Sequence, residues 1–155
     1  MLQCTPTGWL EASYQISEDG RPLAILKPAA WREAATLTLD GADYRLYRRG
    51  WRGPFVLEHN GATLAEARKP SAWRDQFEIS IAGERLSLRR ESPWRYGWRL
   101  ERDGQPIGVL RSTGFWKRTI EAELPEQLPL AVRLFVLWLT LLVKRRDEIT
   151  VIAAS

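Results

Sequence analysis

Apolar residues occupy every second position in several short segments of the chain. In the segment 77–81 they are Phe77, Ile79 and Ile81, and the segment 85–89 alternates in the same way. A period of two places successive side chains on opposite faces of an extended chain. These segments therefore predict antiparallel strands with one face in the protein core and the other in water.

Turn signals separate the predicted strands and fall into two series. Gly20, Gly61 and Gly104 each follow an Asp or Asn residue, and Gly41 and Gly83 form a second series between them. Asn-Gly and Asp-Gly pairs adopt the positive φ angles that a tight hairpin turn requires. Strands and turns together predict an all-β domain built from consecutive hairpins.

The chain also repeats itself at a step of 42 residues. The segment KPAAWRE at 27–33 is matched in identity or residue type at every position by KPSAWRD at 69–75. Agreement of this extent indicates an internal repeat, whose unit holds four strands in two hairpins joined by a Pro-containing link. We assign one domain over 1–155 with units at about 9–50, 51–94 and 95–155, and with Pro28, Pro70 and Pro93 in the links.

The third unit departs from this pattern. After the segment 115–121 the expected hairpin is interrupted by the segment 124–129, and a long apolar run follows. We expect the segment 148–152 to supply the missing strand, which brings the three units to twelve strands.

The apolar run from Leu130 to Val143 contains a single charged residue, Arg133. It is longer than an ordinary strand, Pro129 suits the first turn of a helix, and the basic residues 144–146 complement the negative end of a helix dipole. The run therefore predicts a helix over about 128–146. Because this helix is apolar on every side, it must be buried in protein or in lipid.

The length of the run favours burial in protein. Its ten uncharged residues, 134–143, cover roughly 15 Å, about half of the hydrocarbon core of a bilayer. A longer span would place Arg133 inside the membrane at a cost of roughly 3 kcal/mol. The alternative is a tail anchor with the basic residues 144–146 on the cytoplasmic side.

The apolar helix also selects among β folds. Three four-strand blades are too few to close a propeller, and a trefoil has no space for a buried helix of this length. A twelve-stranded closed barrel has a lumen that must be filled, and a helix fills it without unpaired backbone groups. We therefore predict a mainly β fold, in which a twelve-stranded antiparallel closed barrel of three four-strand repeats encloses one hydrophobic C-terminal helix.

Composition adds an expected compartment. Cys4 is the only cysteine, so no disulfide can form within the chain, and the first residues contain no apolar signal region. Both observations favour the cytoplasm. The net charge of +4 is modest, and we interpret the eight tryptophans as filling and capping the barrel, so we expect no nucleic-acid partner.

No catalytic constellation is recognisable in the sequence. His59 is the only histidine and precedes a predicted turn, which leaves too few ligands for a metal site and no base for a nucleophile. The carboxylates, such as Glu78 and Glu101, alternate with apolar residues as on the wet face of a strand. We expect a protein that is not an enzyme and holds neither a metal nor another cofactor.

Arginine supplies the remaining functional signal. Basic clusters occupy similar places in successive units, and in a barrel of repeated units they are expected near one rim. Because the guanidinium group binds phosphate oxygens as a fork, this rim is a candidate ligand-binding site. An alternative is that the arginines only pair with carboxylates across the strands. The candidate residues are Arg48, Arg49, Arg52, Arg89, Arg90, Arg95, Lys117 and Arg118.

This layout resembles the tubby C-terminal domain, whose superfamily includes LURP-one-related proteins and phospholipid scramblases. The resemblance rests on the KPxxW links at 27–31 and 69–73, on the three units, and on the run LPLAVRLFVLWL at 128–139. It implies a barrel of twelve antiparallel strands around a central hydrophobic helix, with binding of phosphoinositides at membranes or movement of lipids as the role. No acidic cluster matches the calcium ligands of a scramblase.

We therefore expect a non-enzymatic binding module that docks on anionic phospholipid headgroups, or on another phosphate-bearing ligand, through rim arginines. Such a protein would lie in the cytoplasm, at times peripheral to a membrane surface. The alternatives are a scaffold that binds a protein partner and no small ligand, and a membrane-anchored, scramblase-like protein.

Overall fold

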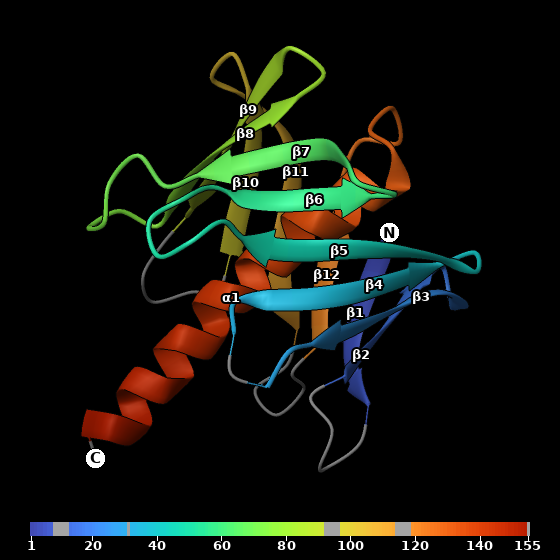
Figure 1. Cartoon of the computed structure of the whole chain (residues 1–155), viewed down its shortest axis with the longest axis horizontal. Coiled ribbons are helices and arrows are strands. Elements are labelled where there is room, and N and C mark those ends of the chain that lie inside the picture. The colour runs from blue at the N-terminus through green and yellow to red at the C-terminus, as the bar shows by residue number, and fades with distance from the viewer. Residues whose placement is uncertain (8–12, 31, 92–96, 114–118, 155) are drawn as a thin grey trace.

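A computed structural model describes residues 1–7, 13–30, 32–91, 97–113 and 119–154. In this part of the chain twelve antiparallel strands form one closed barrel around a single helix, α1 (Figure 1). The elements are β1 (Leu2–Thr7), β2 (Ser13–Glu18), β3 (Arg21–Pro28), β4 (Ala34–Leu39), β5 (Ala42–Arg48), β6 (Phe55–His59), β7 (Ala62–Arg68), β8 (Gln76–Ile81), β9 (Glu84–Arg90), β10 (Gly97–Arg102), β11 (Gln105–Thr113), β12 (Thr119–Glu123) and α1 (Leu130–Ala154). The predicted fold class is thus confirmed.

The strands follow the predicted alternation and the predicted turns. In β8 the inward residues Phe77, Ile79 and Ile81 are buried, whereas the residues between them are exposed. Each two-residue turn between paired strands has positive φ at both positions, including Ala82, whose φ is 46°. Consecutive strands are hydrogen-bonded neighbours around the whole barrel, so local hairpins account for almost all of the sheet.

The last strand differs from the prediction. The segment 148–152 is helical and exposed, and the barrel is closed instead by β1, which pairs with β12 at Leu2↔Ala122 and Cys4↔Ile120. The third unit therefore consists of β10, β11 and β12 with β1 from the opposite end of the chain. The expectation was wrong because the first residues of the chain already occupy this edge, and no Gly or Pro after Leu130 ends the helix.

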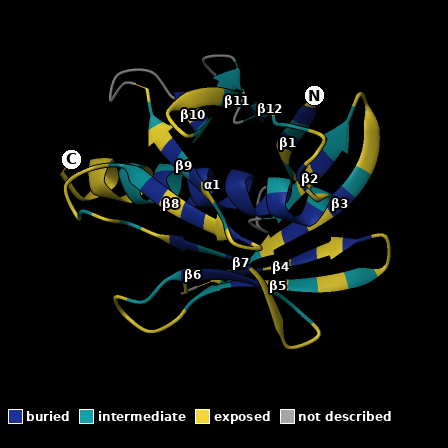
Figure 2. Cartoon of the chain, turned by 90° about the horizontal axis from the view of Figure 1, so that it is seen from above, coloured by how far each residue is buried: buried dark blue, intermediate teal, exposed yellow. Residues whose placement is uncertain are grey.

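The helix is enclosed by the barrel over its apolar half, as predicted (Figure 2). Every residue from Ala131 to Val143 except Arg133 is buried. The rings of Phe135 and Trp138 stack 6.0 Å apart, and Trp138 meets Phe55 of β6 edge to face at 6.0 Å. Helix and strands thus share one hydrophobic core.

The helix is longer than the predicted 128–146, and its last residues leave the barrel. Residues 148–154 are exposed, and Figure 1 shows this part of α1 extending beyond the strands. At the other end of the helix, Arg133 forms an ion pair with Glu18 at 3.4 Å and donates a hydrogen bond to the Leu128 carbonyl at 3.2 Å. These partners compensate the one charge within the apolar run. No helix in the described residues combines the length and the apolar character that are needed to cross a bilayer.

Replacement of Phe135 tests the shared core. Phe135→Ala removes a fully buried ring that contacts Trp138, so we expect it to lower the free energy of unfolding by about 3–5 kcal/mol in urea titrations. Ile149→Ala on the same helix is the matched control, because Ile149 is 66% exposed; it should change stability by at most about 0.5 kcal/mol. Equal effects of the two substitutions would contradict enclosure of the helix.

Cys4 gives the barrel a specific response to alkaline pH. Burial raises the pKa of its thiol from 9.0 to about 12, while the charge of Lys144 opposes this only in part. The unfolded chain therefore loses the thiol proton first, and stability falls as the pH rises above 9. At pH 10 the loss relative to neutral pH is about 1.4 kcal/mol. The free energy of unfolding of the protein and of Cys4→Ala should be measured by denaturation at pH 7 and at pH 10. The protein should lose about 1.4 kcal/mol more than the variant between these two pH values. An identical pH dependence of the two proteins would contradict burial of the thiol.

Candidate functional site

The two ends of the barrel differ in length of connection and in charge. The turn end carries the two-residue turns, and these contain Asp19, Asp40 and Asp103 but no basic residue. The loop end carries the longer connections, of which 49–54 and 69–75 are described completely. These two loops contain four basic residues and one acidic residue, Asp75. The barrel is therefore polarised along its axis, with its basic side at the end where α1 emerges.

Each loop presents a tryptophan to solvent. The side chains of Trp51 and Trp73 are 96% and 95% exposed, so the expectation of buried tryptophans is wrong for both. It is confirmed for Trp98 and Trp138, which lie in the core. Trp9, Trp31, Trp94 and Trp116 lie outside the described residues. Large aromatic side chains fully exposed to water contribute little to the fold and commonly mark interaction surfaces.

The tight backbone of the first loop holds Trp51 outward. The Arg49 amide donates to the Pro54 carbonyl at 2.9 Å, which closes the loop, and Gly50 adopts a φ of 66°. A Cβ at Gly53 would lie 1.7 Å from the Arg49 carbonyl oxygen, so the return of the chain requires glycine there. In the second loop the Trp73 amide donates to the Ser71 hydroxyl at 3.2 Å.

Three arginines next to tryptophans in the sequence keep their charge available. Arg32, Arg52 and Arg74 are exposed and form no ion pair within the described part of the chain. An unpaired guanidinium group retains all its donors for an anion. Only Arg52 is among the predicted site residues. A Trp-Arg pair stands between predicted strands at 31–32, 51–52, 73–74 and 94–95, whereas a fifth pair at 98–99 lies inside β10. The position between strands is the signal that could have identified Arg32 and Arg74.

Two of the predicted arginines instead fix the point where α1 leaves the barrel. Arg48 contacts the Glu33 carboxylate at 3.1 Å, and the same carboxylate contacts Arg146 of the helix. Glu33 therefore joins strand β5 to the emerging helix. Arg48 also donates to the Gly53 carbonyl at 3.2 Å, which ties this contact to the first loop.

The second unit repeats the arrangement. Arg90 contacts Asp75 at 2.8 Å and Asp147 of the helix at 2.9 Å, and Lys69 contacts Asp75 at 3.5 Å. Burial opposes the charge of Arg90, but its hydrogen bond with Asp75 and the charge of Asp147 outweigh this and raise its pKa. Arg48 with Glu33 and Arg90 with Asp75 are each separated by 15 residues in sequence. We call these two ion-pair groups the exit clamps; their acids were missed in the sequence.

The remaining predicted site residues are dispersed. Arg49 lies along the barrel wall, where it contacts Glu66 at 2.7 Å, and hydrogen bonds to Tyr47 and Glu66 raise its pKa. Arg89 points outward from β9 and contacts Glu101 at 3.6 Å. Arg95, Lys117 and Arg118 lie outside the described residues. The loop end thus brings together Arg48, Arg52 and Arg90, while Arg49 begins in the same loop end but turns its side chain to β7. Of these four, only Arg52 forms no ion pair among the described residues.

A shallow hollow of about 740 Å³ adjoins the loop end. Arg32, Arg45, Arg48 and Trp51 line it together with Glu33 and Tyr47. Glu33 is already shared by two arginines, and Arg45 contacts Glu58 at 3.6 Å, so the excess positive charge of the hollow comes from Arg32, which forms no ion pair among the described residues. Its lining suits an anion beside an aromatic surface.

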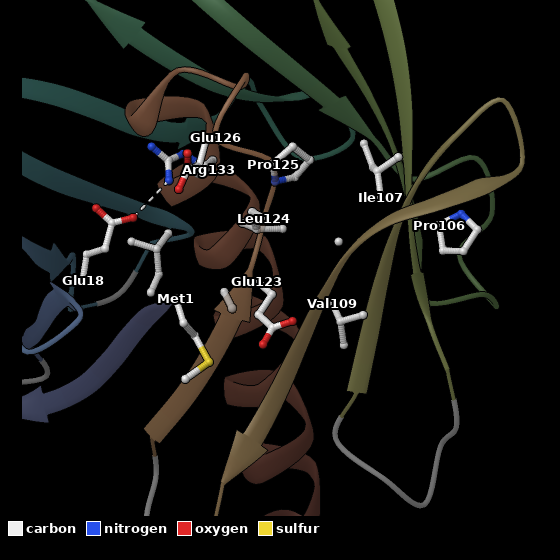
Figure 3. A pocket seen from close by; sticks show the side chains of 13 residues that line it. Met1, Glu18, Pro106, Ile107, Val109, Glu123, Leu124, Pro125, Glu126 and Arg133 are labelled. Carbon is white, nitrogen blue, oxygen red and sulfur yellow. Dashed lines mark hydrogen bonds and ion pairs between the residues drawn. The ribbon is translucent and has the colours of Figure 1, made fainter.

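A second hollow, of about 400 Å³, lies at the turn end and has the opposite character (Figure 3). Glu18, Glu123 and Glu126 line it beside apolar residues such as Ile107 and Leu124. Arg133 reaches its edge but is paired with Glu18, as the dashed line in Figure 3 shows. Its carboxylates disfavour an anionic ligand, so the loop end is the better site for phosphate.

Metal binding receives no support from the described residues, among which no group of three or more His, Cys, Asp or Glu side chains could hold an ion. Comparisons with protein-family models, with curated proteins and with solved structures found no match.

The exit clamps predict a local change when one acid is neutralised. Glu33→Gln removes the charge that Arg48 and Arg146 share, so we expect faster amide hydrogen exchange in residues 144–154 and a loss of at most about 1 kcal/mol in stability, because these side chains are partly exposed to water. Exchange of the buried segment 134–143 should change much less.

Glu78→Gln is the control, because Glu78 is exposed on β8 and forms no ion pair within the described residues. If both variants exchange like the unmodified protein, the clamp does not hold the helix.

Proposed function

We propose that this chain is a non-enzymatic module that docks the loop end of its barrel on anionic phospholipid surfaces. The observation that carries the proposal is the pair of almost fully exposed tryptophans, Trp51 and Trp73. Each precedes an exposed arginine, Arg52 or Arg74, that forms no ion pair with any described residue. Tryptophan favours the boundary between water and the apolar part of a bilayer, and arginine binds the phosphates at that depth. The two residue types therefore suit one surface.

The distribution of charge supports a defined orientation. An anionic surface attracts the loop end and repels the turn end with Asp19, Asp40 and Asp103. Attraction of this kind orients a protein before contact and is worth about 1 kcal/mol for each basic residue near the surface. As part of the same proposal, we place the chain in the tubby C-terminal superfamily. The support for this is the closed barrel around a helix, which is the fold that the resemblance implies.

The two tryptophans add a second, salt-independent attraction. Each indole ring removes on the order of 200 Å² from water when it is buried, which corresponds to an upper limit of about 5 kcal/mol per ring at 25 cal/mol per Å². An interfacial position gains only part of this amount. A single attractive contribution gives weak and reversible attachment to a membrane, so basic and aromatic groups together hold the protein more firmly than either alone.

Flotation with vesicles tests the proposal. We expect binding to vesicles that contain phosphatidylserine and not to vesicles of phosphatidylcholine alone, with affinity that falls as salt is raised. Arg52→Ala with Arg74→Ala should weaken binding about thirtyfold, which corresponds to about 2 kcal/mol. The matched control is Arg21→Ala with Arg85→Ala, since both residues are exposed near the turn end and the change in net charge is the same.

Equal loss in both double variants would show that binding follows net charge and not the loop end, which contradicts the proposal. Absence of binding to acidic vesicles at low salt would also contradict it. Capture of a protein partner together with indifference to lipid is the outcome that the scaffold alternative predicts.

A further inference from the structure

The part of α1 beyond the exit clamps exposes apolar side chains at the loop end. Ile149, Val151 and Ile152 are 66%, 68% and 74% exposed. The same helix is fully buried ten residues earlier, but Ile149, Val151 and Ile152 lie outside the core and do not contribute to its packing. We call residues 148–154 the helix overhang.

The exit clamps give the helix overhang a fixed direction. Arg146 is held by Glu33 and Asp147 by Arg90, so consecutive residues of opposite charge are anchored on two different repeat units. The helix therefore leaves the barrel through the basic end that carries Trp51 and Trp73, and Figure 1 shows it continuing outward as a regular helix. A rigid helix anchored in this way presents the same side chains in every molecule.

We propose that the helix overhang enters the boundary between headgroups and acyl chains of an anionic bilayer when the loop end docks. This inference rests on the proposed function and adds the element that inserts. At a rise of 1.5 Å per residue the overhang is about 10 Å long, which is too short to cross a bilayer but matches the roughly 5–10 Å depth of interfacial helices.

The charges at the base of the overhang agree with a lipid occupant. Lys144, Arg145 and Arg146 outnumber Asp147 and Glu148. Arg146 is paired with Glu33 and Asp147 with Arg90, so two basic residues still stand against one acid, Glu148. Arg145 lies one turn before Ile149 and on the same helix face, so a phosphate group bound to the arginine would lie above the inserted isoleucine. A second copy of the chain would instead bring two basic loop ends together, which like charges disfavour.

A fluorescent reporter on the helix overhang tests insertion separately from docking. In a Cys4→Ala background, a polarity-sensitive dye on Ala153→Cys should shift to shorter wavelength when vesicles with phosphatidylserine are added. The same dye on Gln105→Cys, an exposed residue at the turn end, should not respond. A silent dye at 153 on vesicles that demonstrably bind the protein would overturn insertion and leave electrostatic docking intact.

Substitution of the apolar side chains provides the second readout. Ile149→Ser with Val151→Ser should weaken vesicle binding about tenfold and leave its salt dependence unchanged, since these side chains contribute apolar transfer and no charge. Ile25→Ser, which replaces a 48% exposed residue on the barrel wall, is the matched control and should bind like the unmodified protein.

The remaining outcomes also decide the question. If the double variant binds as tightly as the control, the overhang does not insert. If the unmodified protein sediments as a dimer that the double variant abolishes, and the dye at 153 is already shifted without lipid, the overhang packs on a second copy and the proposal is overturned. If acidic vesicles bind none of the proteins, docking itself fails and insertion fails with it.

Discussion

Burial of an apolar helix inside the barrel is the interaction on which the rest of this structure depends. A ring of twelve strands encloses more space than its own side chains fill, and the segment 131–143 is too apolar to be stable in water. Each part therefore provides what the other lacks. The rings of Phe55, Phe135 and Trp138 meet where strand and helix residues share the core, so neither the barrel nor the helix is expected to persist alone.

Enclosure of the helix also makes the two ends of the barrel unequal. The chain enters the lumen at the turn end, where Arg133 and Glu18 compensate each other, and it leaves at the loop end, where the exit clamps hold Arg146 and Asp147. Tight turns need Asp, Asn and Gly for their positive φ angles, which makes the turn end acidic for purely local reasons. The longer loops are free of this constraint and can carry tryptophan and arginine. The different backbone geometry of turns and loops thus leads to different charges at the two ends of the barrel.

The sequence predicted what depends on local pattern and on volume. Alternation and turn pairs predicted the hairpins, and the apolar run predicted the enclosed helix. Closure by β1 was missed because three register pairs, such as Leu2↔Ala122, join residues that no local signal connects. The exit clamps were missed for a similar reason: Glu33 and Arg146 meet only once the helix path is known. Trp51 and Trp73 were assigned to the core because composition counts tryptophans but does not place them.

The repeat itself shows which features the fold requires and which it does not. Glu33 and Asp75 each lie two residues after a tryptophan, whereas Trp116 of the third unit is followed by Lys117 and Arg118. This acid therefore occurs in the two units that anchor Arg146 and Asp147 and is absent at the matching place in the third. The acid thus occurs in the sequence where it helps to anchor the helix. A Trp-Arg pair instead occurs in each of the two loops that are described completely, 49–54 and 69–75, although Trp51 and Trp73 contribute nothing to the core. A costly exposed side chain that repeats without a packing role is best explained by contact with something outside the barrel.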